Sequence, residues 1–345
     1  MSSRSKARDE VLRKFEKKYG AGAVIKGSDL KGLVMSRVTT GSLAFDIMLG
    51  GGWPVNHWNE IIGQPSAGKT VMAMKTVAAN QAKNPNFEVL WVAAEDLVPE
   101  WAETAGMDLD QIDLVETNVM EEVYEMITQA LSARAYDMIV LDSLPALVPG
   151  DEAEKEMHEA TVSLGAKLTN RFYRVTNKTG GRSLIDTGDR PWTGLVINQW
   201  REKIGVMRGD PRTTPGGKGK DFEYFTRVEV SRSEWILGPA KRRAGIEMKA
   251  KTIKNKTAPV NRVGVVDFYF DELDGFQPGE YDRLKELFFI ALDRDIIEQG
   301  GGIYKYLGER IGKGKDEALQ VIRSTPELFA SVEEEIRRSI LLPDD

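Results

Sequence analysis

The run from Gly63 to Thr70 is the strongest candidate for chemistry in this chain, because it fits the pattern G-x-x-x-x-G-K-[ST] in full. Its glycines let the backbone turn tightly, so that N–H groups converge on phosphate oxygens. Lys69 would reach the β- and γ-phosphates of a nucleotide, and the Thr70 hydroxyl would ligate Mg²⁺. A chance match in a chain of this length is on the order of one in a hundred. The pattern therefore predicts an ATP and Mg²⁺ site rather than a glycine-rich turn that binds nothing, formed by Gly63, Gln64, Pro65, Ser66, Ala67, Gly68, Lys69 and Thr70.

Two acidic residues follow apolar runs and could complete such a site. Asp142 ends the run Met138–Leu141, where ligands bind in open α/β sheets, and there it could hold Mg²⁺ through water. Glu95 closes the run Val89–Ala94, one strand from the phosphate loop, and could polarise the water that attacks ATP. Spacing alone leaves two alternatives open, namely Asp142 as a helix cap and Glu95 as a surface acid.

An alternating pattern of strands and helices must position these residues. We expect an α/β fold, with a mostly parallel sheet covered by helices on both faces. Polar residues at Ser233–Gly245 predict the tip of a hairpin, and Lys178–Pro191 predicts a surface loop. The predicted strands are Trp58–Ile62, Val89–Ala94, Ile112–Val115, Met138–Leu141, Leu195–Asn198, Val228–Val230 and Ile246–Ile253, and the predicted helices are Lys69–Ala82, Glu121–Ala133 and Thr161–Val175.

Both ends of the chain differ from this central region. Apolar residues at helical spacing predict an amphipathic helix from Arg4 to Tyr19, followed by a short extended segment at Ala23–Ile25. Composition shifts again near Gly275–Gly279. Helices at Tyr281–Asp293 and Pro326–Ile340 then predict a small α/β domain. We therefore expect three parts, 1–32, 33–272 and 273–345.

Composition excludes several kinds of chemistry. The chain of 345 residues has no cysteine and only two histidines, His57 and His158, so disulfides, thiolate catalysis and cysteine or histidine zinc clusters are not expected. No apolar run approaches the length of a membrane span and the N-terminus lacks a secretory core, so we expect a cytoplasmic protein with no membrane partner. The net charge of −6 does not exclude DNA, which responds to local charge. Basic residues concentrate in Met1–Tyr19 and Arg201–Lys220.

The run from Ile197 to Gly217, INQWREKIGVMRGDPRTTPGG, closely resembles the mobile DNA-binding loop of bacterial RecA recombinases. Four other segments resemble the same family in chain order: Phe15–Gly22, Thr40–Leu43 with Asp46, Lys254–Lys256 and Gly308–Gly314. The resemblance covers nearly the whole chain and implies a RecA-type P-loop ATPase core in a helical filament.

The resemblance also implies roles for single residues. Glu95 aligns with the water-activating glutamate, and Gln199 with the residue that senses the γ-phosphate. Trp101 matches the aromatic position that stacks on adenine. Lys254 and Lys256 match lysines that reach the γ-phosphate bound to a neighbouring protomer, where they would stabilise developing charge. The implied catalytic set is Glu95, Lys69, Gln199, Lys254 and Lys256.

DNA contacts are implied mainly for the loop after Gln199. Its glycines let N–H groups approach phosphates, its cations neutralise them, and its apolar residues could wedge between bases. Without the resemblance, a disordered basic surface loop would be the better interpretation. The implied DNA-binding residues are Arg201, Lys203, Ile204, Gly205, Val206, Met207, Arg208, Arg212, Thr213, Gly216 and Gly217, with Lys167 and Arg174 on the preceding helix. A second loop between Pro149 and Thr161 matches only loosely, and the basic residues of the last domain could capture duplex or form a solvated surface.

The implied function is strand exchange: a filament on single-stranded DNA pairs that strand with homologous duplex and hydrolyses ATP when DNA is bound. A RecA-fold helicase and an ATP-switched DNA-binding regulator are the alternatives. Three departures from the family pattern bear on them: Ala93 replaces an acid, Asp221 replaces a lysine, and the Lys178–Pro191 loop is longer. Together with the short C-terminal end, these departures would suit a phage or other mobile-element member.

Overall fold

The computed structural model describes residues 3–20, 24, 26–30, 36–150, 162–179, 190–202 and 211–341. Contacts divide the chain into two units, one formed by residues 1–35 and 183–187 and the other by residues 36–182 and 188–345. Much of the predicted segment Ala23–Ile25 and of the predicted loops Lys178–Pro191 and Pro149–Thr161 lies outside the described residues. No helix of the described residues is both long and apolar enough to cross a membrane.

The N-terminal unit contains α1 (Ser3–Tyr19), as predicted, and the short helix η1 (Gly27–Leu30). Lys17 and Lys18 in the last turn of α1 complement the negative end of its dipole. Phe15 and Tyr19, one turn apart, have ring centroids 6.3 Å apart. Val11 and Phe15 remain 45% and 40% exposed. The apolar stripe of α1 is thus not buried by its own unit, which is the state expected of a helix that packs against another surface.

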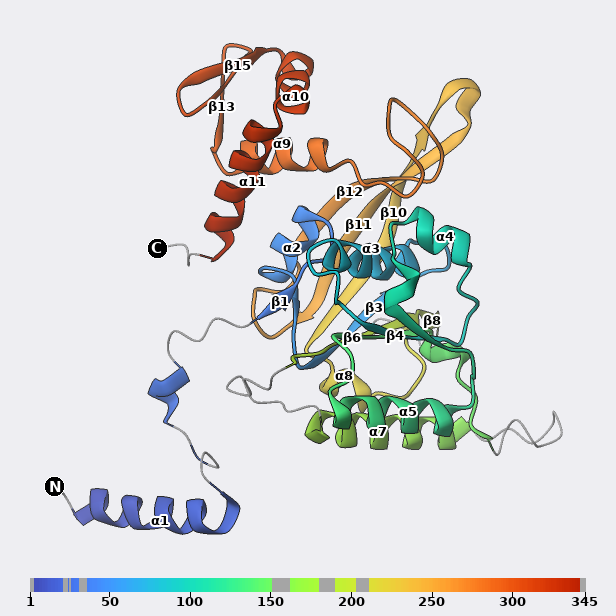
Figure 1. Ribbon diagram of the computed structural model, residues 1–345, viewed down its shortest axis with the longest axis vertical. Helices are drawn as coiled ribbons and strands as arrows, with labels where there is room; N and C mark the ends of the chain where they lie inside the picture. The colour runs from blue at the N-terminus through green and yellow to red at the C-terminus, as the bar shows by residue number, and fades with distance from the viewer. Residues whose placement is uncertain are drawn as a thin grey trace. The chain divides into compact units, whose positions relative to one another are not determined.

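An eight-stranded sheet forms the centre of the second unit, in the order β12-β11-β10-β3-β7-β6-β4-β5 (Figure 1). The pairs from β10 to β5 are parallel, whereas β10–β11 and β11–β12 are antiparallel. The strands are β3 (His57–Gly63), β4 (Val89–Ala93), β5 (Ile112–Val115), β6 (Met138–Asp142), β7 (Thr193–Gln199), β10 (Thr226–Leu237), β11 (Arg243–Asn255) and β12 (Val263–Tyr269). This arrangement confirms the predicted mostly parallel α/β sheet.

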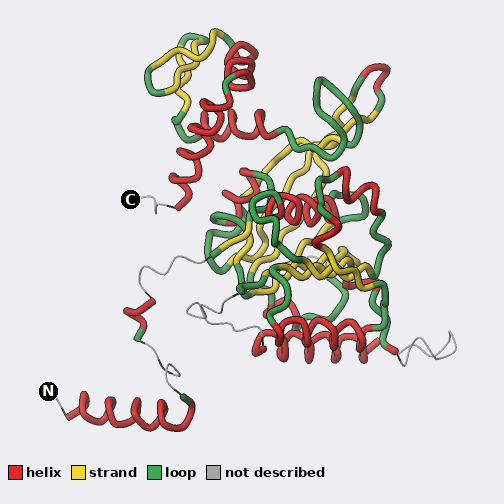
Figure 2. The backbone as a smooth tube through the Cα atoms, viewed as in Figure 1, coloured by secondary structure: helices red, strands yellow, loops and turns green. Residues whose placement is uncertain are grey.

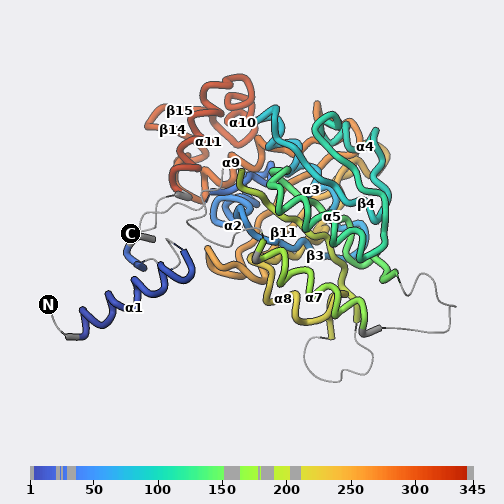
Figure 3. Tube along the Cα trace, turned by 60° about the horizontal axis from the view of Figure 1, so that its bottom comes forward, coloured from blue at the N-terminus to red at the C-terminus, as the bar shows by residue number. Residues whose placement is uncertain are grey.

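Helices cover both faces of the sheet, as Figure 2 shows in red around the yellow strands. Phe45, Met72 and Val77 belong to one buried cluster, on the face covered by α2 (Leu43–Leu49), α3 (Lys69–Gln81) and α4 (Pro99–Thr104). Val123 and Phe172 belong to the other, beneath α5 (Met120–Ala133) and α7 (Val162–Thr179), which lie side by side (Figure 3). The shorter elements are β1 (Arg37–Val38), β2 (Trp53–Pro54), η2 (Leu109–Gln111), η3 (Leu144–Ala146), β8 (Arg201–Glu202), β9 (Arg212–Thr213), α8 (Lys220–Glu223) and η4 (Pro239–Lys241).

The predicted hairpin tip at Ser233–Gly245 was wrong in extent. β10 continues to Leu237 and β11 begins at Arg243, so only Gly238–Arg242 forms the turn. Cross-strand pairs such as Trp235↔Ile246 explain the extension, because they continue the β10–β11 ribbon through the polar residues Ser233 and Glu234, which are exposed. Figure 1 shows this ribbon projecting beyond the other strands. Strand β12 was not predicted.

The C-terminal part is a small α/β domain, as predicted. Its three antiparallel strands lie between helices and enclose a cluster of buried residues that includes Leu287, Phe288 and Ile322. The elements are α9 (Arg283–Asp293), β13 (Ile297–Gly300), β14 (Ile303–Tyr306), β15 (Glu309–Lys313), α10 (Lys315–Ser324) and α11 (Pro326–Leu341).

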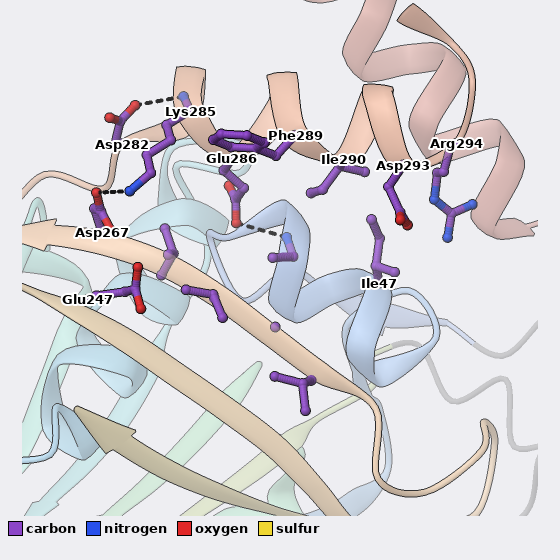
Figure 4. Close-up of a pocket in the computed structure, with 15 residues that line it drawn as sticks. Ile47, Glu247, Asp267, Asp282, Lys285, Glu286, Phe289, Ile290, Asp293 and Arg294 are labelled. Atoms are coloured by element: carbon purple, nitrogen blue, oxygen red, sulfur yellow. Dashed lines mark hydrogen bonds and ion pairs between the residues drawn. The ribbon is translucent and has the colours of Figure 1, made fainter. Parts of the chain in front are cut away.

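A cavity of about 430 Å³ lies where α9 meets α2 and β12 (Figure 4). On its wall Glu286 accepts hydrogen bonds from the Ser42 hydroxyl and from the backbone N–H of Ala44, the latter at 2.8 Å. Burial raises the pKa of Glu286 to about 7 despite these donors. Lys285 Nζ bonds Asp267 Oδ2 at 2.6 Å. Polar contacts thus attach the C-terminal domain to the core.

We predict that Gly194→Ala destabilises the protein, because an added Cβ would lie 2.2 Å from the Trp58 ring. Trp58 is fully buried, so the ring has little room to move. We expect a loss of about 1–3 kcal/mol in the free energy of unfolding, measured from the shift of the urea midpoint. Gly300→Ala is the control, since its Cβ would meet nothing within 4 Å. Equal midpoints for the two variants would contradict this account of the packing.

Candidate active site

The predicted phosphate loop joins β3 to α3 and has the backbone that an anion site requires. Gly63 has no room for a side chain, because a Cβ would lie 2.3 Å from the Val230 carbonyl oxygen. Gly68 has a φ of 95° and caps α3 without any side-chain hydrogen bond, which leaves the first N–H groups of the helix available for an acceptor. Lys69 Nζ donates to the Gln64 carbonyl at 2.9 Å. Burial lowers the pKa of Lys69, while Asp142 and Glu95 oppose that shift.

Thr70 and Asp142 meet as the sequence predicts for a magnesium site. Thr70 Oγ1 donates to Asp142 Oδ2 at 2.9 Å. The other carboxylate oxygen, Oδ1, is buried and has no hydrogen-bond partner in the described part of the chain. Burial raises the pKa of Asp142 to about 6, although Thr70 and Lys69 act in the opposite direction. A hydroxyl and a carboxylate oxygen with unused acceptor capacity fit a hydrated Mg²⁺ ion, which prefers oxygen ligands.

Glu95 lies just beyond β4 and is held from three directions. Its backbone N–H donates to the Asp142 carbonyl at 2.9 Å. Its Oε1 accepts hydrogen bonds from the Ser143 hydroxyl and from Gln199 Nε2, the latter at 3.4 Å. The carboxylate therefore stands between the end of β6 and the end of β7, with Oε2 free of these two donors. This placement suits a group that orients water beside a phosphate.

These groups line one cavity of about 540 Å³. Trp101 lies on its wall and packs edge-to-face on Phe268, with ring centroids 6.1 Å apart. Trp235 reaches the same cavity from the β10–β11 ribbon. Arg232 and Arg243 lie 4.0 and 4.2 Å from the Trp235 ring centroid, and Phe270 meets it edge-on. A phosphate-binding loop at one end and aromatic rings at the other can accommodate a purine nucleotide.

Lys254 and Lys256 are not among the described residues that line this cavity. Lys254 lies at the far end of β11 and Lys256 directly after that strand, and Lys254 Nζ donates to the carbonyls of Asp221 and Phe222 at 2.6 and 3.2 Å. Burial, followed by the charges of Lys256 and Arg227, lowers the pKa of Lys254 to about 8. Lys256 lies over the Phe225 ring at 5.4 Å. The two lysines thus lie away from the nucleotide cavity of their own chain, and their action on a neighbouring protomer stays a prediction.

The stem of the predicted DNA loop is ordered as a short antiparallel pair, β8 with β9. Arg212 NH1 bonds Glu229 Oε1 at 2.6 Å, and its guanidinium lies 4.7 Å from the Trp200 ring centroid. Trp200 Nε1 donates to the same Glu229 oxygen at 2.9 Å. The predicted contacts Lys203, Ile204, Gly205, Val206, Met207 and Arg208 lie outside the described residues.

The returning arm of the loop packs against α7. Gly217, with a φ of 78°, comes so close to Ala166 that a Cβ would lie 3.1 Å from the Ala166 side chain. Lys167 follows Ala166, and Lys167 and Arg174 are both exposed. Two turns of helix separate them, so they lie on one side of α7. A Cβ at Gly219 would likewise lie 2.2 Å from Asn170, which is one turn of helix from both Lys167 and Arg174, so these two cations lie on the side on which the loop returns.

Two protein-family models match the chain in order. The RecA N-terminal domain matches residues 6–274, and the RecA C-terminal domain matches residues 285–341. The chain belongs to the RecA family. It is therefore a recombination and DNA-repair protein that binds ATP and DNA. Protein RecA of Lactobacillus acidophilus is 35% identical over 335 residues, which are 96% of this chain and 88% of the relative. Protein RecA of Staphylococcus aureus (strain JH9) is 34% identical over 344 residues, which are 99% and 94% of the two chains.

Within this RecA-family chain, sequence reasoning missed several residues that line or adjoin the nucleotide cavity. Ser143 directly follows Asp142, so the strand-end argument that found Asp142 could have included it. Phe268 near the end of β12 and Phe270 just after it are two residues apart, a spacing that would have indicated one shared face. Trp235 and Arg232 come from a distant segment and carried no local signal. The roles of the predicted residues stay predictions, although the structure gathers the phosphate loop, Glu95, Trp101, Asp142 and Gln199 around one cavity.

We predict that Thr70→Val weakens Mg²⁺-dependent ATP binding at least tenfold, because valine has a similar shape but cannot ligate a metal. Thr70→Ser keeps the hydroxyl and should bind within about threefold of the original chain. Titration of a fluorescent ATP analogue at increasing Mg²⁺ concentrations measures both. Unchanged Mg²⁺ dependence in Thr70→Val would remove Thr70 from the metal site.

Proposed function

We propose that this chain is a DNA-dependent ATPase that assembles on single-stranded DNA as a helical filament and exchanges strands with homologous duplex DNA. One observation carries this proposal. Gln199 contacts Glu95 at the nucleotide cavity, and the β8–β9 stem of the DNA loop begins two residues later. A displacement of Gln199 by a bound γ-phosphate would therefore be passed directly to the loop. Such continuity suits an enzyme in which each ligand changes the response to the other.

ATP hydrolysis would use groups that the cavity already gathers. Mg²⁺, held by Thr70 and through water by Asp142, would neutralise phosphate charge when bound. Lys69 would contact the β- and γ-phosphates, Trp101 would stack on adenine, and Glu95 would orient and deprotonate the attacking water. Gln199 would exchange its contact with Glu95 for one with the γ-phosphate, which would leave Ser143 as the remaining side-chain donor to Oε1.

A neighbouring protomer would complete the site. Lys254 and Lys256 would approach the γ-phosphate bound to the next protomer and stabilise charge in the transition state. ATP would then lie at an interface and favour the filament, because it binds the assembled form. The exposed apolar stripe of α1 supports packing against another copy. We accordingly assign residues 1–32 to protomer contacts, 33–272 to the ATPase core and 273–345 to the C-terminal domain.

Single-stranded DNA would follow the loop after Gln199 and the adjoining side of α7. Arg201 and the loop cations would neutralise phosphates, while Lys167 and Arg174 would extend that surface. Lys305, Arg310, Lys313 and Lys315 in the C-terminal domain would meet incoming duplex. The helicase and regulator alternatives lose support, because both RecA domains match in order over nearly the whole chain.

We predict that single-stranded DNA stimulates ATP hydrolysis by this chain at least tenfold, because DNA binding organises the loop that begins beside Gln199. Lys69→Ala, which lacks the phosphate-binding ammonium, should show no hydrolysis above background. Phosphate release measures both, and a strand-pairing assay then separates a recombinase from a helicase. ATP binding without any stimulation would favour the ATP-switched regulator.

We also predict that Lys254→Ala and Lys69→Ala chains complement each other when mixed. Each alone should be inactive, the first because its neighbours lack the lysine and the second because its own site cannot hold ATP. In an equal random mixture roughly a quarter of the head-to-tail interfaces would combine an intact nucleotide site with an intact lysine. DNA-stimulated hydrolysis should therefore reappear on mixing. A mixture as inactive as its components would show that the site is not shared in this way.

A further inference from the structure

Four charged side chains meet outside the nucleotide cavity: Glu60 on β3, Lys220 and Asp221 on α8, and Arg227 on β10. Lys220 Nζ lies 2.8 Å from Asp221 Oδ1 and 3.6 Å from Glu60 Oε1. Arg227 Nε lies 2.6 Å from Glu60 Oε2, and its NH2 lies 3.2 Å from Asp221 Oδ1. The side chains of Glu60 and Lys220 are 0% exposed. We call these four residues the buried ion cluster.

Packing does not account for a lysine at this position. A charge removed from water is costly unless it is paired and hydrogen-bonded, and apolar residues of similar volume often replace buried ion pairs without loss of stability. Arg227 already pairs with both carboxylates of the cluster. A methionine could fill the volume of the Lys220 side chain at lower desolvation cost. The ammonium group is therefore better explained by the groups to which it donates.

On one side, Lys220 holds the returning arm of the DNA loop. Its Nζ donates to Thr214 Oγ1 at 2.6 Å, and the buried Thr214 directly follows β9. Gly216 lies against the same side chain, since a Cβ there would come within 2.9 Å of Lys220 Cδ. The arm thus crosses the lysine at close range and is hydrogen-bonded to its ammonium.

On the other side, the cluster holds the strand that carries Gln199. Glu60 Oε1 accepts a hydrogen bond from Asn198 Nδ2 at 2.7 Å. Asn198 Oδ1 in turn accepts one from the backbone N–H of Gln199 at 2.9 Å. The amide of Asn198 and the ammonium of Lys220 therefore interact with the same oxygen of Glu60, Oε1. A shift of the Gln199 backbone would change the position of that oxygen and the balance of its partners.

We propose that Lys220 is a positioning residue that couples the nucleotide site to the DNA loop, by joining Glu60 beneath Gln199 to Thr214 on the returning arm. This inference rests on the proposed function, because it assumes that Gln199 meets ATP and that the loop meets DNA. It adds a second, buried connection to the direct one through β8. Adjacency alone does not establish coupling, so the inference is tested by the response of one site to the other.

The test is ATP hydrolysis by the full-length Lys220→Met variant across ATP and single-stranded DNA concentrations. Methionine keeps the volume but removes every donor. We expect DNA-independent hydrolysis and the KM for ATP to stay within about twofold of the original chain, and stimulation by DNA to fall about tenfold or more. Lys285→Met is the matched control, because Lys285 is also a lysine paired with a largely buried carboxylate, here Asp267 near the C-terminal domain at 2.6 Å. It should leave stimulation unchanged.

Thr214 provides a second variant that leaves the ion pairs intact. Thr214→Val should reproduce the loss of stimulation, and Thr214→Ser, which keeps the hydroxyl, should restore it. The double variant Lys220→Met with Thr214→Val should be no worse than Lys220→Met alone, because both remove the same hydrogen bond. If Lys220→Met fails to fold, Thr214→Val and Thr214→Ser by themselves test whether the bond between Lys220 and Thr214 couples the two sites.

Two results would overturn the inference while leaving the proposed function in place. One is full stimulation in both Lys220→Met and Thr214→Val. The other is an equal loss of basal and stimulated hydrolysis in Thr214→Val, which would mark a structural role. A parent chain that DNA does not stimulate would instead overturn the proposed function, and the inference with it.

Discussion

The parallel pairing of β3 with β7 is the constraint on which the rest of the site depends. Its register places Gly63 opposite Gln199, so the start of the phosphate loop and the proposed γ-phosphate sensor leave the sheet side by side. β6 and β4 continue the same edge and bring Asp142 opposite Ala93. A slip of one residue would turn every side chain of a strand to the other face. The indole of Trp58 lies against Gly194 and resists such a slip, because a residue with a side chain in place of Gly194 would clash with the ring.

The antiparallel pair β10–β11 connects several parts of the proposed cycle. Trp235 and Ile246 line the nucleotide cavity near one end of the β10–β11 pair, and Lys254 lies near the opposite end of β11. Eight residues of extended chain separate Ile246 from Lys254, roughly 27 Å. Between them Glu229 holds Arg212 at the stem of the loop. A protomer would thus present its own site at one end of the ribbon and a neighbour's cations at the other.

How much the sequence reveals depends on whether the signal is local. The phosphate loop is a contiguous pattern, and Asp142 and Glu95 follow from the rule that strand ends gather ligands, so these residues could be predicted. The extent of β10 could not, because Ser233 and Glu234 are polar and are typical of a turn until β11 is known to pair with them. Lys220 lies in a polar, glycine-rich stretch in which nothing indicates burial. Its environment is made by β3 and β10, which are distant in the chain. The roles of Lys254 and Lys256 need a second molecule, and no pattern within one chain could derive them.

The two hydrogen bonds to Glu95 Oε1 have a consequence for how much ATP is consumed in the absence of DNA. Donors from Ser143 and Gln199 both occupy this oxygen and hold the carboxylate in one orientation. If Glu95 and Gln199 have the proposed roles, a protomer without DNA would therefore hydrolyse ATP slowly while both donors remain on Glu95 Oε1. Release of Gln199 toward the γ-phosphate would remove one of these restraints. The contact between Gln199 and Glu95 would then both detect the nucleotide and limit wasteful ATP turnover.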